Sequence, residues 1–169
     1  NREVEALFKD YPQAISNTQV IADQCQFELL HGIQELPEYP LPAGVTAIEY
    51  IRQLCLEAIP RRYRNASPET LKQIHNRIEH ELGVIQRTHS ENYFLLVWDI
   101  CRFAREKGIR YNGRGSGANS LVAYLLYISP VDPLQFNLVF ERFLSDERQI
   151  AGDFDIDFES RRRPEIIQY

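Results

Sequence analysis

The stretch Asp153-Phe154-Asp155-Ile156-Asp157-Phe158-Glu159 alternates acidic and large apolar residues. Because side chains on a β-strand point alternately to its two faces, this alternation predicts a strand with the acids on one face. At about 3.3 Å per residue, neighbouring Cα atoms on that face would lie about 6.6 Å apart. Carboxylates that close repel one another, so a cation between them would stabilise the fold. The stretch is therefore either a metal-binding strand or an edge strand with a solvated acidic face.

A second informative segment is Gly113-Arg114-Gly115-Ser116-Gly117-Ala118-Asn119-Ser120, which follows a predicted short strand at 109–111. Its three glycines allow a tight turn and a close approach of the backbone to a ligand. A predicted apolar helix at 119–128 would direct its N–H groups and its positive dipole end toward this turn. Ser116 adds a hydroxyl donor, and Arg114 can make charge-assisted bonds to phosphate. On its own, however, the segment is equally typical of a tight turn before a capped helix.

Together the two segments indicate nucleotidyl transfer. A glycine-serine turn before a helix can hold a triphosphate, and an Asp-x-Asp strand can hold two metal ions. Magnesium suits this arrangement, because it is bound by one or two carboxylates together with substrate phosphates.

The composition limits the alternatives. The chain has 169 residues, of which 44% are hydrophobic and 25% charged, and its net charge of −5 argues against a general polyanion binder. No apolar run is long enough to span a membrane. Three cysteines without C-x-x-C spacing predict reduced core thiols in a cytosolic protein, and the four histidines form no metal-ligand pattern. Three clusters of basic residues, around 61–64, 102–110 and 161–163, are either solvated faces or contacts for a phosphate-bearing ligand.

The order of predicted elements indicates a helix-rich α+β protein. A proline-rich linker at 34–44 separates a helical segment, which begins or breaks at Pro12, from the rest of the chain. Ser67 and Ser90 are predicted helix caps, and Gly108 a helix end. The remaining predicted helices lie at 46–58, 68–85, 91–107, 119–128 and 134–144 and after 160, with a strand at 150–158. The predicted buried stripe of the helix after Ser90 consists of Tyr93, Leu96, Val97, Ile100, Phe103 and Ala104.

Several motifs closely resemble the palm of C-family DNA polymerases, which include the alpha subunit of bacterial DNA polymerase III. The resemblance extends over essentially the whole chain and is most specific between 113 and 158. The motifs that carry it are Gly113-Arg114-Gly115-Ser116, Ala118-Asn119-Ser120, Val131-Asp132-Pro133, Phe140-Glu141-Arg142-Phe143-Leu144, Glu147-Arg148 and Asp153-Phe154-Asp155-Ile156-Asp157-Phe158.

The resemblance implies a partial nucleotidyltransferase palm of the DNA polymerase beta type with a helical N-terminal region. Residues 1–44 would be a lead-in from a preceding PHP domain and a linker, and 45–169 the N-terminal part of the palm. The family places a third catalytic carboxylate on a later palm strand, so we expect the segment alone to be inactive. Phe158-Glu159-Ser160, Arg162 and Ile167-Gln168-Tyr169 look more like the error-prone paralogues of the family than the replicative enzyme.

The resemblance also assigns roles to single residues. Asp155 and Asp157 would be the catalytic metal ligands, and Asp153 a further ligand or a close neighbour of the ligands. The cofactor would be two Mg²⁺ ions, with Mn²⁺ as a substitute. The nucleotide-binding candidates are Gly113, Arg114, Gly115, Ser116, Arg142 and Arg148, of which Arg142 and Arg148 are equally good candidates for structural ion pairs.

The function that follows is DNA-directed DNA polymerisation in a bacterial cytoplasm, associated with the nucleoid. The partners would be primer–template DNA and deoxynucleoside triphosphates, with a sliding clamp and other replisome or repair subunits bound by regions outside this segment. The alternative is a non-catalytic nucleic-acid-binding module with a degenerate palm. A metal-dependent phosphoesterase is a third interpretation, which the lack of histidine clusters disfavours.

Overall fold

The computed structural model describes residues 2–26, 37–145 and 153–169, and the chain divides into two compact units, Asn1–Glu35 and Leu36–Tyr169. The first unit contains α1 (Arg2–Leu7) and α2 (Pro12–Gln24), so the predicted helix start at Pro12 is confirmed. Neither helix has a buried residue. The division falls within the predicted linker at 34–44, and the assignment of the units to a PHP lead-in and a palm stays a prediction.

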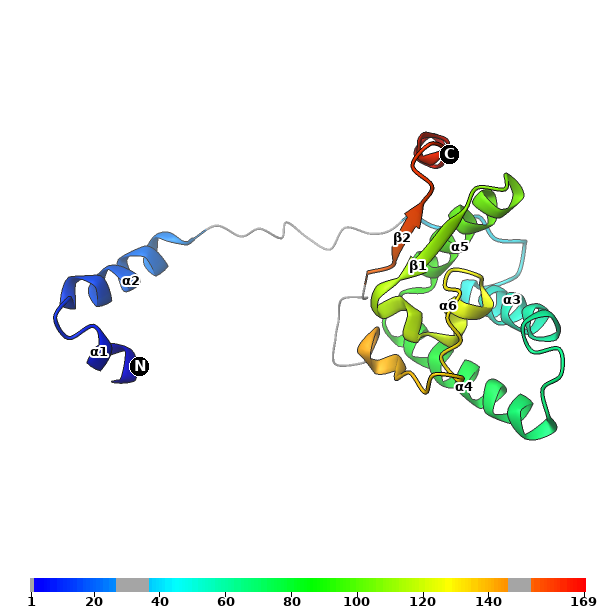
Figure 1. Ribbon diagram of the computed structural model, residues 1–169, viewed down its shortest axis with the longest axis horizontal. Coiled ribbons are helices and arrows are strands. Elements are labelled where there is room, and N and C mark those ends of the chain that lie inside the picture. The colour runs from blue at the N-terminus through cyan, green and yellow to red at the C-terminus, as the bar shows by residue number, and fades with distance from the viewer. Residues whose placement is uncertain (1, 27–36, 146–152) are drawn as a thin grey trace. The chain divides into compact units, whose positions relative to one another are not determined.

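Three long helices form the framework of the second unit (Figure 1). They are α3 (Ala47–Arg62), α4 (Pro68–Arg87) and α5 (Glu91–Glu106). Thr46 and Glu49 form a reciprocal capping box at the start of α3, and the Ser67 hydroxyl accepts the Thr70 N–H at the start of α4. Gly108, with φ of +64°, follows the end of α5 as predicted. These local signals explain why the helices begin close to the predicted residues, but α3 continues past its predicted end at 58 to Arg62, with Pro60 inside it.

The core lies between these helices and α6 (Leu121–Leu125), all five of whose residues are buried. The predicted stripe of α5 was wrong at four positions: Tyr93, Leu96, Ile100 and Phe103 are only partly buried. The buried side of α5 instead consists of Phe94, Leu95, Val97, Trp98, Cys101 and Ala104. Cys55 and Cys101 are buried as predicted, whereas Cys25 is exposed.

Two predicted helices were wrong in length or type. The helix predicted at 119–128 is a five-residue helix, and the one predicted at 134–144 is a series of turns that ends in the 3₁₀ helix η2 (Phe140–Arg142). Asp132 Oδ1 accepts the N–H groups of Leu134 and Gln135, a capping contact that starts a single turn. Asn137, with φ of +49°, then turns the chain out of the helical region.

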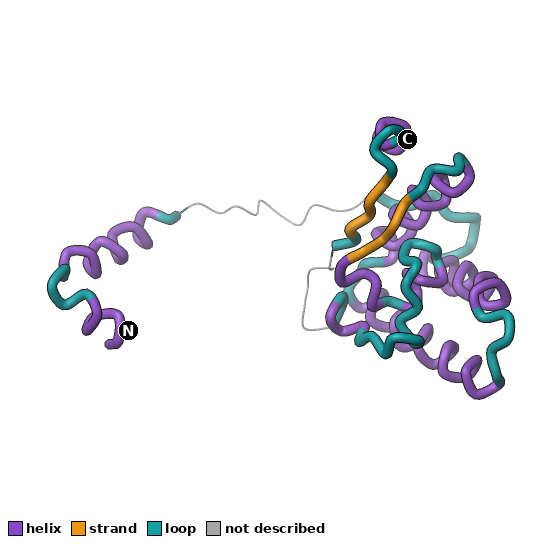
Figure 2. Tube along the Cα trace, viewed as in Figure 1, coloured by secondary structure: helices purple, strands orange, loops and turns teal. Residues whose placement is uncertain are grey.

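A two-stranded antiparallel sheet stands beside the helices (Figures 1 and 2). It consists of β1 (Tyr111–Arg114) and β2 (Asp155–Phe158), in the register Tyr111↔Phe158 and Arg114↔Asp155. β1 therefore begins later than the strand predicted at 109–111 and includes the first residues of the glycine-rich segment. The strand predicted at 150–158 was too long at its start, because Asp153 and Phe154 precede β2, and residues 150–152 lie outside the described residues.

The last helix, α7 (Arg163–Gln168), is tied to α5 through Tyr169. The Tyr169 ring stacks on Phe103 with centroids 4.0 Å apart, and its hydroxyl donates to Asp99 Oδ2 at 2.6 Å. Burial raises the pKa of the Asp99 carboxyl, but bonds from Tyr169 and Arg102 outweigh it and hold this pKa below its usual value. The architecture is thus helix-rich α+β, as predicted, and no helix in the described part of the chain is long and apolar enough to cross a membrane.

Candidate active site

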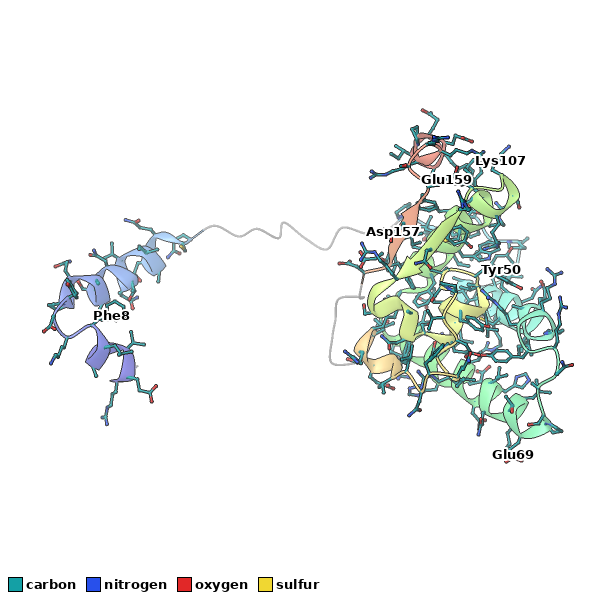
Figure 3. All side chains as sticks on the ribbon, viewed as in Figure 1. Phe8, Tyr50, Glu69, Lys107, Asp157 and Glu159 are labelled. Carbon is teal, nitrogen blue, oxygen red and sulfur yellow. The ribbon has the colours of Figure 1, made fainter. Side chains whose placement is uncertain are left out.

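The two carboxylates of β2 share one exposed face of the sheet. Asp155 and Asp157 are exposed, whereas the alternating residues Ile156 and Phe158 are half-buried. Ile156 packs against the hydrophobic core, which fixes the register of the strand and leaves the acids outside. Figure 3 shows Asp157 on β2 at the outer side of the helical unit. The predicted acidic face is therefore confirmed for Asp155 and Asp157, whereas Asp153 and Glu159 lie outside the strand.

Arg114 connects these carboxylates to the glycine-rich segment. Its Nε donates to Asp157 Oδ2 at 3.0 Å, and its Nη1 donates to Asp155 Oδ2 at 3.3 Å. The strand pairing explains the contact, because Arg114 lies directly opposite Asp155 in the ladder. Two segments that are about forty residues apart in sequence thus meet at one site.

The chain turns away from β1 at Gly115, where φ is +76°. A Cβ at this position would lie 2.8 Å from Asp155 Oδ2, so a side chain would push the carboxylate away. The following 3₁₀ helix η1 (Gly115–Asn119) is closed by the Asn119 amide, which donates to the Ser116 carbonyl at 2.8 Å. The candidate nucleotide-binding residues Gly113, Arg114, Gly115 and Ser116 are therefore held immediately beside the acidic face.

Phe154 anchors the start of β2 in an aromatic cluster. Its ring centroid lies 4.7 Å from that of Phe143 and 5.1 Å from that of Phe94. Its N–H donates to the Tyr93 hydroxyl at 2.9 Å. Burial raises the pKa of the Tyr93 phenol, so this hydroxyl stays protonated near neutral pH. Packing at Phe154 thus positions Asp155 without using the carboxylates themselves.

Glu81, on α4, is a fully buried carboxylate that was not among the residues predicted from the sequence. Its oxygens accept hydrogen bonds from the Arg77 guanidinium at 2.6 Å and from the Ser120 hydroxyl at 2.8 Å. They also accept the backbone N–H groups of residues 121 and 122, at 3.0 and 3.1 Å. Burial raises the pKa of the Glu81 carboxyl, and these bonds oppose that increase. The signal in the sequence is an acid that follows Ile78 by three residues, within the apolar stripe of α4.

These bonds overturn one expectation. We predicted that the helix after the glycine-rich segment would offer free N–H groups to a ligand, but Glu81 accepts those of Leu121 and Val122, and Ser120 Oγ accepts that of Ala123. The helix N-terminus therefore stabilises the fold, and its N–H groups are not available to a phosphate.

The remaining candidates are placed as follows. Asp153 is exposed, and the described residues contain no cluster of three or more His, Cys, Asp or Glu side chains that could hold a metal, so its role stays a prediction. Arg142 is an exposed residue of η2, which packs against η1. Arg148 lies outside the described residues.

One arginine from each predicted basic cluster is used structurally. Arg62 stacks on the rings of Tyr124 and Tyr127, with its guanidinium carbon 4.1 and 3.9 Å from their centroids. Arg102 pairs with Asp99 and Glu106, and Arg162 pairs with Glu165. These three residues therefore support the fold and are poor candidates for phosphate contact.

The donors of the site suit a hard divalent cation. Asp155 and Asp157 present carboxylate oxygens on one face, and a single positively charged group already bridges them. Mg²⁺ takes one or two protein carboxylates and completes its shell with water and substrate phosphate. The geometry therefore fits a metal that is shared between the protein and a phosphorylated ligand.

Comparison with known proteins agrees with this chemistry. The family described as "Bacterial DNA polymerase III alpha NTPase domain" matches residues 49–169. The DNA polymerase III subunits alpha of Bacillus subtilis and Halalkalibacterium halodurans are 42% and 46% identical to the chain over 168 residues, or 99% of it. The error-prone DNA polymerase of Symbiobacterium thermophilum is 45% identical over 162 residues, or 96% of the chain.

The chain spans about 15% of the length of each of these relatives. Relatives of both names match at similar identity, so the predicted likeness to the error-prone paralogues stays a prediction. The match to the family covers all of α3 except its first two residues, the whole of α4 and α5, and the site itself. The chain belongs to the bacterial DNA polymerase III alpha NTPase domain family.

Proposed function

We propose that this chain forms part of the active site of a DNA-directed DNA polymerase and binds the metal–triphosphate complex of the incoming deoxynucleotide. The observation that carries the proposal is the pairing of β1 with β2, which places Arg114 and the Gly115–Ser116 turn beside Asp155 and Asp157. Family membership and the names of the relatives support it. Within a palm of the DNA polymerase beta type, these residues would be the nucleotide-binding half of the centre.

In the reaction, the 3′-hydroxyl oxygen of the primer attacks the α-phosphorus of the deoxynucleoside triphosphate. A new phosphorus–oxygen bond forms, the bond between the α- and β-phosphates breaks, pyrophosphate leaves, and the hydroxyl proton passes to solvent. When bound, Mg²⁺, or Mn²⁺ in its place, would lower the pKa of the attacking hydroxyl and offset the negative charge of the leaving pyrophosphate.

The residues of the chain have separate roles in this proposal. Asp155 and Asp157 would hold the metal ions, and Asp153 is either a further ligand or a close neighbour of the ligands. The backbone at Gly115 and Ser116 contacts the triphosphate, and Arg114 contributes positive charge to it. Template DNA, a sliding clamp and other replisome or repair subunits would bind the longer polymerase, and we expect primer extension from that protein and not from these 169 residues.

Calorimetric titration of dATP into the 169-residue chain, with and without Mn²⁺, tests the proposal. We expect binding that requires the metal and that weakens by at least about tenfold in Asp155→Asn and in Asp157→Asn, because each substitution removes a ligand charge. Glu159→Gln is the matched control, because Glu159 directly follows the same strand but its carboxylate pairs with Arg110 instead of Arg114, at 3.5 Å from Arg110 Nε. This substitution should leave dATP binding unchanged.

Circular dichroism of each variant shows whether the fold is retained. Two results would contradict the proposal: dATP binding by the folded wild-type chain that does not depend on Mn²⁺, or dATP binding that is equally tight in Asp155→Asn and Asp157→Asn. DNA affinity that is independent of metal and of both carboxylates would favour the alternative, a non-catalytic nucleic-acid-binding module.

A further inference from the structure

Arg114 lies where a cation shared by the two carboxylates would lie. Its guanidinium contacts an oxygen of Asp157 at 3.0 Å and an oxygen of Asp155 at 3.3 Å, through two different nitrogens. Any metal ion held by the same two oxygens would therefore meet a positive charge within a few ångströms. Arg114 and a metal ion are direct electrostatic competitors for these carboxylates.

The arginine is held weakly enough to be displaced. Its side chain is 57% exposed, and those of Asp155 and Asp157 are 47% and 61% exposed. Ion pairs at such exposure are screened by water and contribute little stability. Arg114 ends β1 and directly precedes the turn at Gly115, so a rotation of its long side chain can carry the guanidinium toward that turn without moving the strand.

We infer that Arg114 is a displaceable counter-charge that couples metal binding to nucleotide binding at this site, an inference that rests on the proposed function. Without ligands, Arg114 offsets part of the negative charge of Asp155 and Asp157 and lowers their affinity for a metal ion alone. When metal and triphosphate bind together, Asp155 and Asp157 would hold the metal and the released guanidinium would bond to phosphate oxygens. The site therefore disfavours a bare metal ion and favours the metal–triphosphate complex, with positive coupling between the two ligands.

The test is the affinity of the 169-residue chain for Mn²⁺, measured from the electron paramagnetic resonance signal of the free ion, with and without dATP. In Arg114→Gln we expect affinity for Mn²⁺ alone to rise about fivefold, because a competing positive charge is removed. We expect affinity for dATP in the presence of Mn²⁺ to fall about tenfold, because the bonds to phosphate are lost. These two changes have opposite signs, which a loss of folding could not produce.

Two further variants control for charge. Arg110→Gln removes the same charge from a side chain that is 91% exposed and that pairs with Glu159, so both affinities should stay within about twofold of wild type. Arg114→Lys keeps the charge but not the forked geometry, so both affinities should lie between those of the wild type and of Arg114→Gln.

The outcomes separate this inference from the proposed function. If Asp155→Asn abolishes Mn²⁺ binding but Arg114→Gln binds Mn²⁺ no more tightly than wild type, the counter-charge role is wrong and the metal site stands. Equal increases in Arg114→Gln and Arg110→Gln would also overturn the role, because the effect would then come from net charge. If no variant binds Mn²⁺ through Asp155 and Asp157, both the inference and the proposed function fail.

Discussion

Glu81→Ala is expected to lower the free energy of unfolding by roughly 3–5 kcal/mol, because it breaks a buried ion pair and leaves its partners without a carboxylate. Arg77 would lose its contact at 2.6 Å, and the N–H groups of Leu121 and Val122 would be buried without an acceptor. Arg77 also donates to the carbonyls of Asn119 and Leu138, so the loss would spread to both segments. Urea unfolding followed by circular dichroism measures the change.

Glu79→Ala is the matched control for this prediction. Glu79 lies two residues away on the same helix and pairs with Arg52 at 2.8 Å, but its side chain is 58% exposed. Its loss should cost at most about 1 kcal/mol, as is usual for exposed ion pairs. Glu81→Gln keeps the shape of the side chain, so its loss of stability should lie between those of Glu81→Ala and Glu79→Ala. This variant gives a measurable free energy of unfolding even if Glu81→Ala does not fold. Equal costs for Glu81→Ala and Glu79→Ala would show that Glu81 does not hold the start of α6.

Gly113→Ala has the second largest expected effect, about 3 kcal/mol of lost stability. A Cβ at Gly113 would lie 2.2 Å from the carbonyl oxygen of Ile128 and 3.0 Å from its carbonyl carbon. Both atoms belong to the backbone, so no side-chain rotation relieves the clash, and β1 itself must move. Because Gly113 pairs with Ile156, between the two acids, nucleotide binding should weaken together with stability.

Gly83→Ala provides the contrast. Gly83 is inside α4, and the nearest atom to an added Cβ is the end of the flexible Arg87 side chain, at 3.1 Å. Alanine is favoured over glycine in a helix interior by roughly 0.5–1 kcal/mol, so this variant should be as stable as wild type or slightly more stable. Thermal unfolding of both variants compares them directly. A Gly113→Ala chain with unchanged stability and nucleotide affinity would contradict the close approach of β1 to residue 128.

Local signals in the sequence were sufficient for the long helices and for the acidic strand. Ser67-Pro68-Glu69 marked the start of α4, and the regular spacing of apolar residues in this helix marked its buried side. α5 was harder, because residues 93–98 are all apolar and a continuous run does not select one face. Phe94 and Trp98 are buried in the structure because they pack against aromatic residues that are distant in the sequence, Phe154 and Tyr50.

The site required information that no local pattern contains. The two segments were predicted to act together, but the register that sets Arg114 opposite Asp155 depends on the packing of Ile156 and Phe154 against the core. The contacts of Arg114 with both carboxylates follow from that register. The role of Glu81 likewise depends on residues about forty positions away. An acid within an apolar stripe was visible in the sequence, but its partners were not.

The most direct test of the account is the position of the metal. Crystals of the 169-residue chain grown with Mn²⁺ and a non-hydrolysable dATP analogue would show the ion by its anomalous scattering. The account predicts a peak about 2.1 Å from one carboxylate oxygen of Asp155 and one of Asp157, with phosphate oxygens next to the Gly115–Ser116 turn and Arg114 turned away from the acids. A peak that avoids both carboxylates, or a triphosphate bound elsewhere, would contradict it.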